Sequence, residues 1–524
     1  MRCLRSFSTL VAFALTFALA VATIASARAE TALRTLISTD IRGLAPGTGP
    51  DFATGTVLQQ IYEGLVAWRS DGTVAPMLAK SIDVSPDGLA YTFTIRDGVK
   101  FHNGAPLTSK EVVWTWKRFL DPANNWSCRA NFDGTRQIHI VSVEAKDDMT
   151  VVFRLEKPAG ALLTMMARSD CDSTGIAHPD SVDANGAFTR AIGTGPFRLA
   201  EWKKGEYVEL ERFADYASRP EPTDGLAGGK KALVDKLRFL IIPDQSSAKL
   251  ALQSGALDVF WDIPGDFARD LASDKNIKIV VSPVAGTNNI VMETTDPVLK
   301  DVRMRRAIAA ALDTAALREA LTAGFGKAGG SLITPTSAYY GEVERAGNVY
   351  DLEAAKRLLA EAGYKGEKIT ITTNAQYGRM HDTAVLAQAM LQAAGINAEV
   401  DVVDFAKQYD RYYKGAFQLM TWDTTPYLDP ILIFDRFIGD KSKQPEKIWD
   451  DPKAIDLLNQ LYQTSDPAKR QPIFDELHRL YLADAPLVAW LFRNVPTALR
   501  DNVEGYEPWP GEKARFWGVS LKAP

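Results

Sequence analysis

The chain has 524 residues, of which 46% are hydrophobic and 24% are charged, and its formal net charge is −5. This composition is ordinary for a globular protein with a substantial core, and the length corresponds to about three domains or to two large lobes. A net negative charge argues against a nucleic-acid-binding protein or a protein that binds anionic membranes. No segment beyond the N-terminal region approaches the length of a spanning helix, so we expect no direct membrane insertion.

Residues 1–29 have the pattern of a cleavable secretory signal. Two arginines precede the apolar run 10–24, and an Ala-Arg-Ala sequence ends the segment. A basic start, a short apolar centre and an A-x-A end are typical of a signal peptide rather than of a membrane anchor. We therefore predict cleavage after Ala29 and a periplasmic mature protein.

Two cysteines, Cys128 and Cys171, remain after removal of the signal, because Cys3 lies within it. An even pair in an oxidising compartment predicts one disulfide, which would add about 4 kcal/mol of stability in the chain-entropy description. Two free thiols are the alternative. A metal site is disfavoured because no histidine lies near the pair at ligand spacing.

The predicted elements alternate between helix and strand, which indicates a mixed α/β protein without solenoid repeats. Hydrophobic periodicity predicts a helix over 57–68 and a strand over 91–95. Thr108 and Glu111 form a capping box at the start of a helix that ends before Pro122. The later predicted elements are strands at 151–155, 197–199 and 207–210, a helix at 246–254 closed by Gly255, a strand at 257–260, helices at 303–312 and 352–362, a strand at 369–372, a helix at 382–394 and a strand at 399–403.

The usual catalytic motifs are absent. The chain contains no H-E-x-x-H, C-x-x-C, G-x-S-x-G or phosphate-binding-loop sequence, and its five histidines are not spaced as metal ligands. We therefore expect no catalytic residue, no metal site and no cofactor. A secreted hydrolase, whose acidic residues the sequence does not pair, is the alternative.

The segment 421–430 follows a predicted strand and is too rich in turn residues to continue it. It carries Trp422 and Tyr427, and large aromatic rings beside turns are typical of a cleft that encloses a ligand, because they bury much area with few rotors. Packing in the protein core is the alternative role of both rings.

Sequence blocks that follow the pattern of one family are spread over nearly the whole chain. With them the chain resembles the extracytoplasmic solute-binding proteins of ABC importers, family 5, which include dipeptide-, oligopeptide- and nickel-binding proteins. The blocks lie at 60–66 (QIYEGLV), 75–79 (APMLA), 91–104 (YTFTIRDGVKFHNG) with 112–114, 193–197, 251–255 with 258–259, 301–308 and 354–364.

The resemblance implies an α/β, two-lobed periplasmic-binding-protein fold of the large, cluster C type. Lobe I would hold residues 30–285, with a subdomain near 76–190 that contains both cysteines. Lobe II would hold residues 286–489, and residues 490–524 would return to lobe I. A monomer of this kind closes its hinge on a small-molecule or peptide ligand and delivers it to the transmembrane subunits of an ABC permease.

The resemblance also bears on the ligand. In peptide-binding members an aspartate three residues before an Asp-Pro-like dipeptide captures the ligand's amino group. Here the dipeptide is Asp429-Pro430, the corresponding residue is Pro426, and the nearest acid is Asp423. The usual amine anchor is absent unless Asp423 replaces it. The Trp-then-Pro-Tyr arrangement is closer to the nickel-chelate-binding branch, although no histidine lies near Trp422.

Further candidates follow the predicted strand 369–372, where Arg379 could take a ligand carboxylate with two hydrogen bonds. A solvated side chain near a helix start is its alternative role. We expect the ligand to be a small peptide-like or other polar organic solute, with an opine-like conjugate or a metal chelate as alternatives. The predicted ligand-binding residues are Trp422, Asp423, Tyr427, Arg379, Asn374 and Tyr377.

Overall fold

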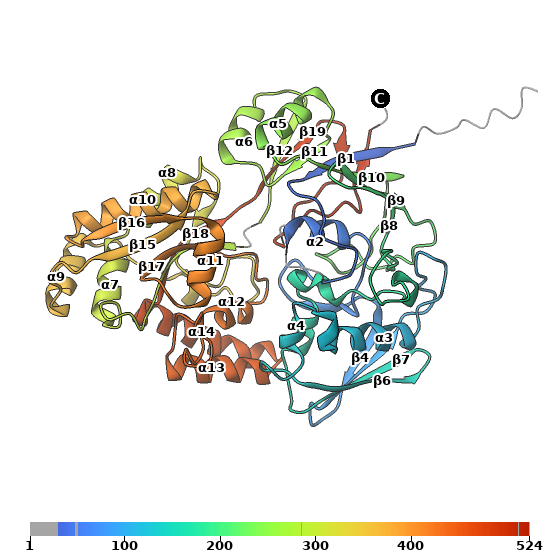
Figure 1. The fold of residues 1–524 in the computed structure, drawn as a ribbon, viewed down its shortest axis with the longest axis horizontal. Helices are drawn as coiled ribbons and strands as arrows, with labels where there is room; N and C mark the ends of the chain where they lie inside the picture. The colour runs from blue at the N-terminus through green and yellow to red at the C-terminus, as the bar shows by residue number, and fades with distance from the viewer. Residues whose placement is uncertain (1–29, 48–50, 284–285, 512, 523–524) are drawn as a thin grey trace, which may run out of the picture.

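The computed structural model describes residues 30–47, 51–283, 286–511 and 513–522. The predicted signal, residues 1–29, lies outside the described residues. The chain forms two bodies, which we call lobe I and lobe II, with a smaller three-stranded sheet between them at one end (Figure 1). Among the described residues, no helix combines the length and apolar character needed to cross a membrane.

Lobe I is built around two four-stranded sheets. In the first, the outer strand β1 runs parallel to β10 and the other neighbours are antiparallel; in the second, all neighbours are antiparallel. The first sheet has the order β1 (Ala32–Ile37), β10 (Lys236–Ile241), β9 (Tyr207–Arg212) and β8 (Phe197–Lys203), and the second has the order β4 (Ala79–Val84), β5 (Ala90–Ile95), β7 (Thr150–Leu155) and β6 (Ile140–Asp147).

The helix α3 (Ser109–Leu120) packs beside the second sheet and starts where the capping box predicts. The backbone N–H of Thr108 donates to the Glu111 carboxylate at 2.9 Å, and the Lys110 N–H donates to the Thr108 hydroxyl. Both bonds satisfy donors that the first helical turn leaves without a partner. The ring of Trp116, on the inner face of α3, is fully buried against the sheet residue Phe153. The capping box thus fixes the start of this helix.

The predicted helix at 57–68 is wrong. The helix α2 (Phe52–Leu58) starts at its N-cap Asp51 and is over before Gln60, and residues 66–68 form the strand β2. The physical reason is tertiary: the Gly195 N–H donates to the Ile61 carbonyl at 2.8 Å, and Leu65 pairs through its carbonyl with later backbone groups. These contacts draw the apolar residues into a turn and a strand.

Lobe II contains a mixed six-stranded sheet with helices on both sides (Figure 1). Its strands β15 and β16, and likewise β15 and β17, are parallel. The sheet order is β14 (Lys327–Ala328), β18 (Leu487–Arg493), β13 (Gly286–Met292), β17 (Leu419–Asp423), β15 (Ile369–Asn374) and β16 (Ala398–Val403), and the helices are α7 (Val302–Ala311), α8 (Thr314–Leu321), α9 (Leu352–Ala362), α10 (Gly378–Ala393), α11 (Phe405–Tyr413), α12 (Ile431–Phe437), α13 (Pro452–Gln463) and α14 (Pro467–Asp484).

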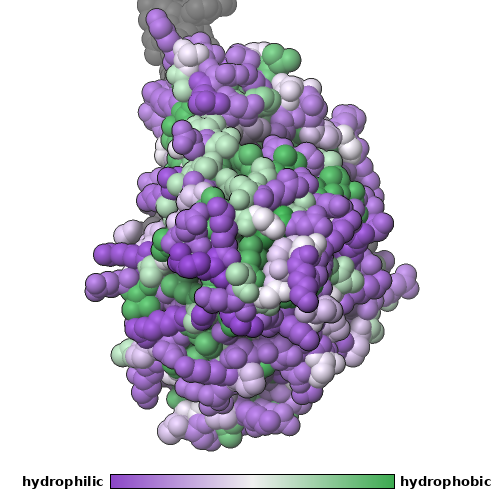
Figure 2. Space-filling model, turned by 90° about the vertical axis from the view of Figure 1, so that its left-hand side faces the viewer, coloured by the Kyte–Doolittle hydropathy of each residue, from purple (hydrophilic) through white to green (hydrophobic). Residues whose placement is uncertain are grey.

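The outer face of lobe II is mainly hydrophilic, with apolar residues scattered between polar ones (Figure 2). Polar side chains face solvent there, and the apolar faces of the helices turn toward the sheet. The large buried side chains of lobe II therefore lie between its sheet and its helices.

The start of one predicted helix in lobe II shifts. The helix α10 begins at Gly378 instead of 382, because the Asn374 side-chain oxygen accepts the Tyr377 N–H at 2.8 Å and closes the turn before the helix. The predicted helix ends at Gly255 and Gly363 are confirmed, and both glycines have the left-handed backbone that favours glycine.

The three-stranded sheet lies at the junction of the lobes, where the chain crosses between them after β12 and again after β18 (Figure 1). The two crossing segments are bonded to each other: the Ser282 N–H donates to the Val495 carbonyl at 3.0 Å, and the Val495 N–H donates to the Ser282 hydroxyl at 2.9 Å. This pairing makes a narrow hinge. The sheet consists of β11 (Val259–Trp261), β19 (Pro496–Arg500) and β12 (Ile277–Val281) with α5 (Gln245–Ser254) and α6 (Gly265–Leu271), and the smaller elements are β2 (Val66–Trp68), β3 (Val74–Pro76), α4 (Leu162–Met166), β20 (Val503–Glu504) and β21 (Ser520–Leu521).

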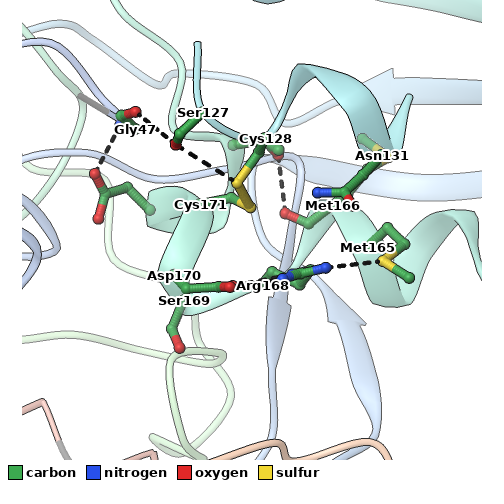
Figure 3. Close-up of a disulfide and its surroundings, with 12 residues drawn as sticks. Gly47, Ser127, Cys128, Asn131, Met165, Met166, Arg168, Ser169, Asp170 and Cys171 are labelled. Carbon is green, nitrogen blue, oxygen red and sulfur yellow. Dashed lines mark hydrogen bonds and ion pairs between the residues drawn. A yellow bond between two sulfur atoms is a disulfide. The ribbon is translucent and has the colours of Figure 1, made fainter. Parts of the chain in front are cut away.

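The predicted disulfide is present: Cys128 and Cys171 are bonded, and both are buried (Figure 3). Cys171 belongs to the short 3-10 helix η3 (Ser169–Thr174), which follows α4. The bond therefore ties η3 to the loop after α3.

Replacing both cysteines by serine is expected to lower the free energy of unfolding by about 2–4 kcal/mol, because the bond closes a loop of 43 residues and restricts the unfolded chain. Urea denaturation of the variant and of the oxidised wild type measures the difference. Reduced wild type is the control and should unfold like the variant. Equal stability of the variant and the oxidised protein would contradict the expectation.

Candidate functional site

A cavity lies between the lobes, with about 550 Å³ of empty space, part of it open to solvent. Its walls come from segments that are far apart in the sequence. Lobe I contributes Phe52, Trp68, Arg168, Ser169, Asp170 and Lys513, and lobe II contributes the turn 425–428 together with Leu432. A ligand in this cavity would touch both lobes at once.

A charged pair, Arg168 and Asp170, forms part of the lobe I wall. The Arg168 guanidinium donates two hydrogen bonds to the Asp170 carboxylate, at 3.0 and 2.6 Å. Burial by itself lowers the pKa of Arg168, but the neighbouring Asp170 more than offsets this, and the net shift is upward. Arg168 and Tyr427 of lobe II both line the cavity, so the two walls face each other.

The segment that carries this pair is fixed from two sides. The disulfide holds it through Cys171, beside Asp170 (Figure 3). From the other side, the Lys513 ammonium donates to the Ser169 carbonyl at 2.7 Å and lies 3.7 Å from the Asp172 carboxylate. Asp172 has a left-handed backbone, with φ of 49°, which costs free energy in a residue other than glycine. The anchors therefore hold a strained segment against the cavity.

On the lobe II side, Tyr427 lines the cavity, whereas Trp422 is not among the lining residues. The Trp422 side chain is 5% exposed and stacks on Tyr412 with ring centroids 4.2 Å apart. The Arg436 guanidinium lies 5.3 Å from the centre of the Trp422 ring. In this structure Trp422 packs against residues of lobe II; its contact with a ligand stays a prediction.

The predicted charged residues Asp423 and Arg379 lie together, with 3.9 Å between the Arg379 Nε and a carboxylate oxygen of Asp423. Burial raises the pKa of the Asp423 carboxyl, although Arg379 and Arg493 each lower it in part. The distance is too long for a hydrogen bond. Among the described residues, the buried Arg379 Nε has no hydrogen-bond partner. Asp423 and Arg379 thus form an ion pair without a hydrogen bond between these two atoms.

Asn288, which sequence reasoning missed, faces Asp423 from the neighbouring strand β13. Its side chain is 1% exposed, and neither amide atom makes a hydrogen bond of regular geometry within the described part of the chain. The amide is nevertheless close enough to help lower the pKa of Asp423. Buried amides are almost always hydrogen-bonded, so this group has unused capacity for a bound molecule or water.

The last two predicted residues lie at the same edge of the sheet but have contacts within lobe II. Asn374 is fully buried and donates to the Gln408 side chain at 2.6 Å, besides closing the turn before α10. Tyr377 is 45% exposed and packs edge-on against Phe405. Their direct contact with a ligand stays a prediction.

The described residues contain no group of three or more His, Cys, Asp or Glu side chains arranged to hold a metal ion. Sequence reasoning missed the lobe I wall, since Arg168, Asp170 and Lys513 lie in no motif. The only sequence signal for Arg168 and Asp170 is their position beside Cys171. Only the folded chain brings them opposite Tyr427.

Comparison with known proteins gives a consistent result. Residues 73–444 match the bacterial extracellular solute-binding proteins, family 5 (middle). The glutathione-binding protein GsiB of Salmonella typhi is 24% identical over 502 residues, which cover 93% of this chain and 94% of the relative. The oligopeptide-binding protein AppA of Bacillus subtilis is 26% identical over 497 residues, covering 88% and 86%.

Solved structures agree. The binding protein AgaA from A. tumefaciens R10, in complex with agropinic acid, has a TM-score of 0.76 and 25% identity, and the match covers 94% of this chain and 99% of the other. The expected two-lobed α/β fold of a periplasmic binding protein is confirmed. Because the family match covers more than half of its length, the chain belongs to the bacterial extracellular solute-binding proteins, family 5, and serves as the substrate-binding component of an ABC importer.

Proposed function

We propose that the protein captures a small, polar, amino-acid-derived solute that carries a carboxylate, in the cavity between the lobes. The observation that carries this proposal is that both lobes line the cavity. A ligand stabilises the closed arrangement only through its contacts with both walls. Here the lobe I wall offers charged and aromatic groups, and the lobe II wall offers the Tyr427 ring. Closure then presents the loaded protein to the permease.

Unused hydrogen-bonding capacity in lobe II supports a carboxylate in the ligand. The Arg379 Nε and both amide atoms of Asn288 are buried without a regular partner among the described residues. A carboxylate would accept from the guanidinium, which binds such groups in a planar, paired geometry. Asp423 beside them is suited to a cationic or N–H group of the same ligand. The cluster therefore favours a solute with groups of both kinds.

Pro426 argues against an ordinary free-amine peptide. It lines the cavity where peptide-binding members carry the aspartate that binds the amino terminus, and proline offers neither a charge nor an N–H. GsiB is named for glutathione and AgaA was solved with agropinic acid. A modified peptide or an opine-like conjugate therefore fits the wall better than a plain peptide. A metal chelate, the alternative, would have to supply all ligands of its metal.

Several finer properties belong to the same proposal. The mature protein is a periplasmic monomer without catalytic activity, and it begins after cleavage at Ala29. Lobe I comprises about 30–285 with the returning tail, and lobe II comprises the stretch between. The relatives support a binding protein rather than an enzyme, since their names describe binding.

Native mass spectrometry of the purified protein, followed by thermal shift with glutathione, agropinic acid, a plain dipeptide and Fe(III)-EDTA, tests the ligand class. We expect one of the first two compounds to bind, and a ligand at 100 times its Kd adds about 2.7 kcal/mol of stability. The negative control is an uncharged sugar of similar size, which should not stabilise the protein. Binding of the plain dipeptide or the chelate alone would overturn the carboxylate-conjugate proposal.

Asp423→Asn separates the binding role of this residue from a structural one. Burial raises the pKa of Asp423 in the folded protein, so the wild type loses stability as pH rises through the interval between the ordinary and the raised pKa. The asparagine variant should therefore be at least as stable at neutral pH, and the difference should vanish in acid. Its ligand affinity should fall about tenfold, the scale of one lost charged contact.

Thermal unfolding between pH 3 and 8, together with titration of the ligand found in the panel, measures both effects. Asp410→Asn, which changes an exposed carboxylate on α11, is the matched control and should alter neither. Unchanged affinity in Asp423→Asn would remove this residue from the site.

A further inference from the structure

The lobes meet a second time at the end of the cavity opposite the hinge. There the subdomain of lobe I, around α4, lies against α13 and the turn that precedes α14 in lobe II (Figure 1). We call this region the distal contact; it consists of residues 71–72, 136–137 and 160–164 of lobe I and residues 428–429, 435, 459 and 462–465 of lobe II. The hinge and the distal contact bracket the cavity.

Glycine at position 160 permits the distal contact. A Cβ atom at Gly160 would lie 2.5 Å from the Thr464 carbonyl carbon and 2.6 Å from the Ser465 nitrogen. Both are backbone atoms, which cannot turn aside as a flexible side chain does. The backbone of Gly160 is outside the left-handed region, so its own conformation does not require glycine, and the three atoms nearest to such a Cβ all belong to lobe II. The requirement for glycine therefore comes from the other lobe.

A second glycine also meets lobe II, although its left-handed backbone, with φ of 81°, favours glycine by itself. A Cβ atom at Gly72 would collide with the carbonyl of Leu428, the last residue of the turn that lines the cavity. Close by, the Ala338 N–H of lobe II donates to the Asp71 carbonyl at 3.2 Å. Backbone thus meets backbone at two separate points of the distal contact.

Polar groups complete the distal contact. The Thr164 hydroxyl of lobe I donates to the Asp429 carboxylate at 3.1 Å. Asp429 is held in turn by two hydrogen bonds from Arg470, each 2.8 Å long. At the rim, the Gln137 amide donates to the Asn459 side chain at 3.1 Å. Lobe II alone therefore holds the Asp429 carboxylate, which accepts the hydrogen bond from Thr164, in position.

We propose that the distal contact is a latch that stabilises the closed arrangement of the lobes by its own contacts, and that Gly160 and Thr164 are the residues that set how far the lobes close. The proposal rests on the closure that solute capture requires, but not on the identity of the solute. A latch raises the population of the closed, binding-competent state, and apparent affinity increases in proportion to that population. Residues that never touch the ligand would thereby tune its affinity.

The test compares wild type, Gly160→Ala, Gly160→Val and Thr164→Val, all as dialysed full-length mature protein without added solute. Small-angle X-ray scattering reports the separation of the lobes, and hydrogen exchange followed by mass spectrometry reports the local contact. We expect the Gly160 variants to have a larger radius of gyration than wild type. We also expect amide exchange at least about tenfold faster in residues 159–164 and 460–465, as is typical of a lost protective contact.

Gly378→Ala is the matched steric control, because a Cβ atom there meets nothing within 4 Å. It should scatter and exchange like wild type. Circular dichroism and a cooperative melt establish that each variant is folded. If Gly160→Val does not fold, the decision rests on Gly160→Ala and on Thr164→Val, which replaces one hydroxyl by a methyl group and should open the lobes to a smaller extent.

Wild-type scattering in all folded variants would overturn the proposal, even with faster local exchange, because the distal contact would then be packing without influence on closure. A larger radius of gyration in the Gly160 variants but not in the control supports it. Neither result depends on the ligand panel, so a failure of the latch and a failure of the proposed ligand class are distinguishable.

Discussion

The structure depends on the pairing of two chain segments at the hinge. Ser282 and Val495 bond to each other where the chain passes from one lobe to the other and back. Rotation about so few residues moves each lobe as a whole, because the packed interior of each lobe resists deformation. The cavity between the lobes and the distal contact therefore form or separate together.

The charged pair in the cavity lining and the predicted charged pair of lobe II follow a common pattern. Arg168 is neutralised by Asp170 in lobe I, and Arg379 lies beside Asp423 in lobe II. An unpaired charge in a site of low dielectric would be costly, and pairing reduces that cost before any ligand arrives. The two pairs differ in how firmly they are made. The lobe I pair has two hydrogen bonds, whereas the lobe II pair is longer and leaves the Arg379 Nε without a partner among the described residues.

The lobe I wall shows how a site can be held by features outside it. The strained segment that carries Arg168 and Asp170 is anchored by the disulfide and by Lys513 from the C-terminal tail. Strain of this kind persists only where surrounding contacts over-determine the conformation. The disulfide and the returning tail thus contribute to the shape of the cavity as well as to the stability of the subdomain.

Several local elements have signals within a few residues of the chain and could be predicted from them. They are the capping box at Thr108, the glycine ends after α5 and α9, the strand β5 and the pairing of two cysteines. The sequence also carried the family blocks, and through them the two-lobed fold. These features could be predicted because caps, periodicity and turn residues act over short stretches of chain.

The tertiary structure decided the rest. The segment 57–68 forms a turn and a strand because distant backbone groups bond to it. Trp422 is buried inside lobe II, where its ring stacks on Tyr412. The sequence drew attention to Asp423 and Arg379, whose contact with a ligand stays a prediction, and no motif pointed to Arg168, Asn288 or Gly160. Their roles come from contacts between segments more than a hundred residues apart, such as Asn288 with Asp423, and no local pattern in the chain records such contacts.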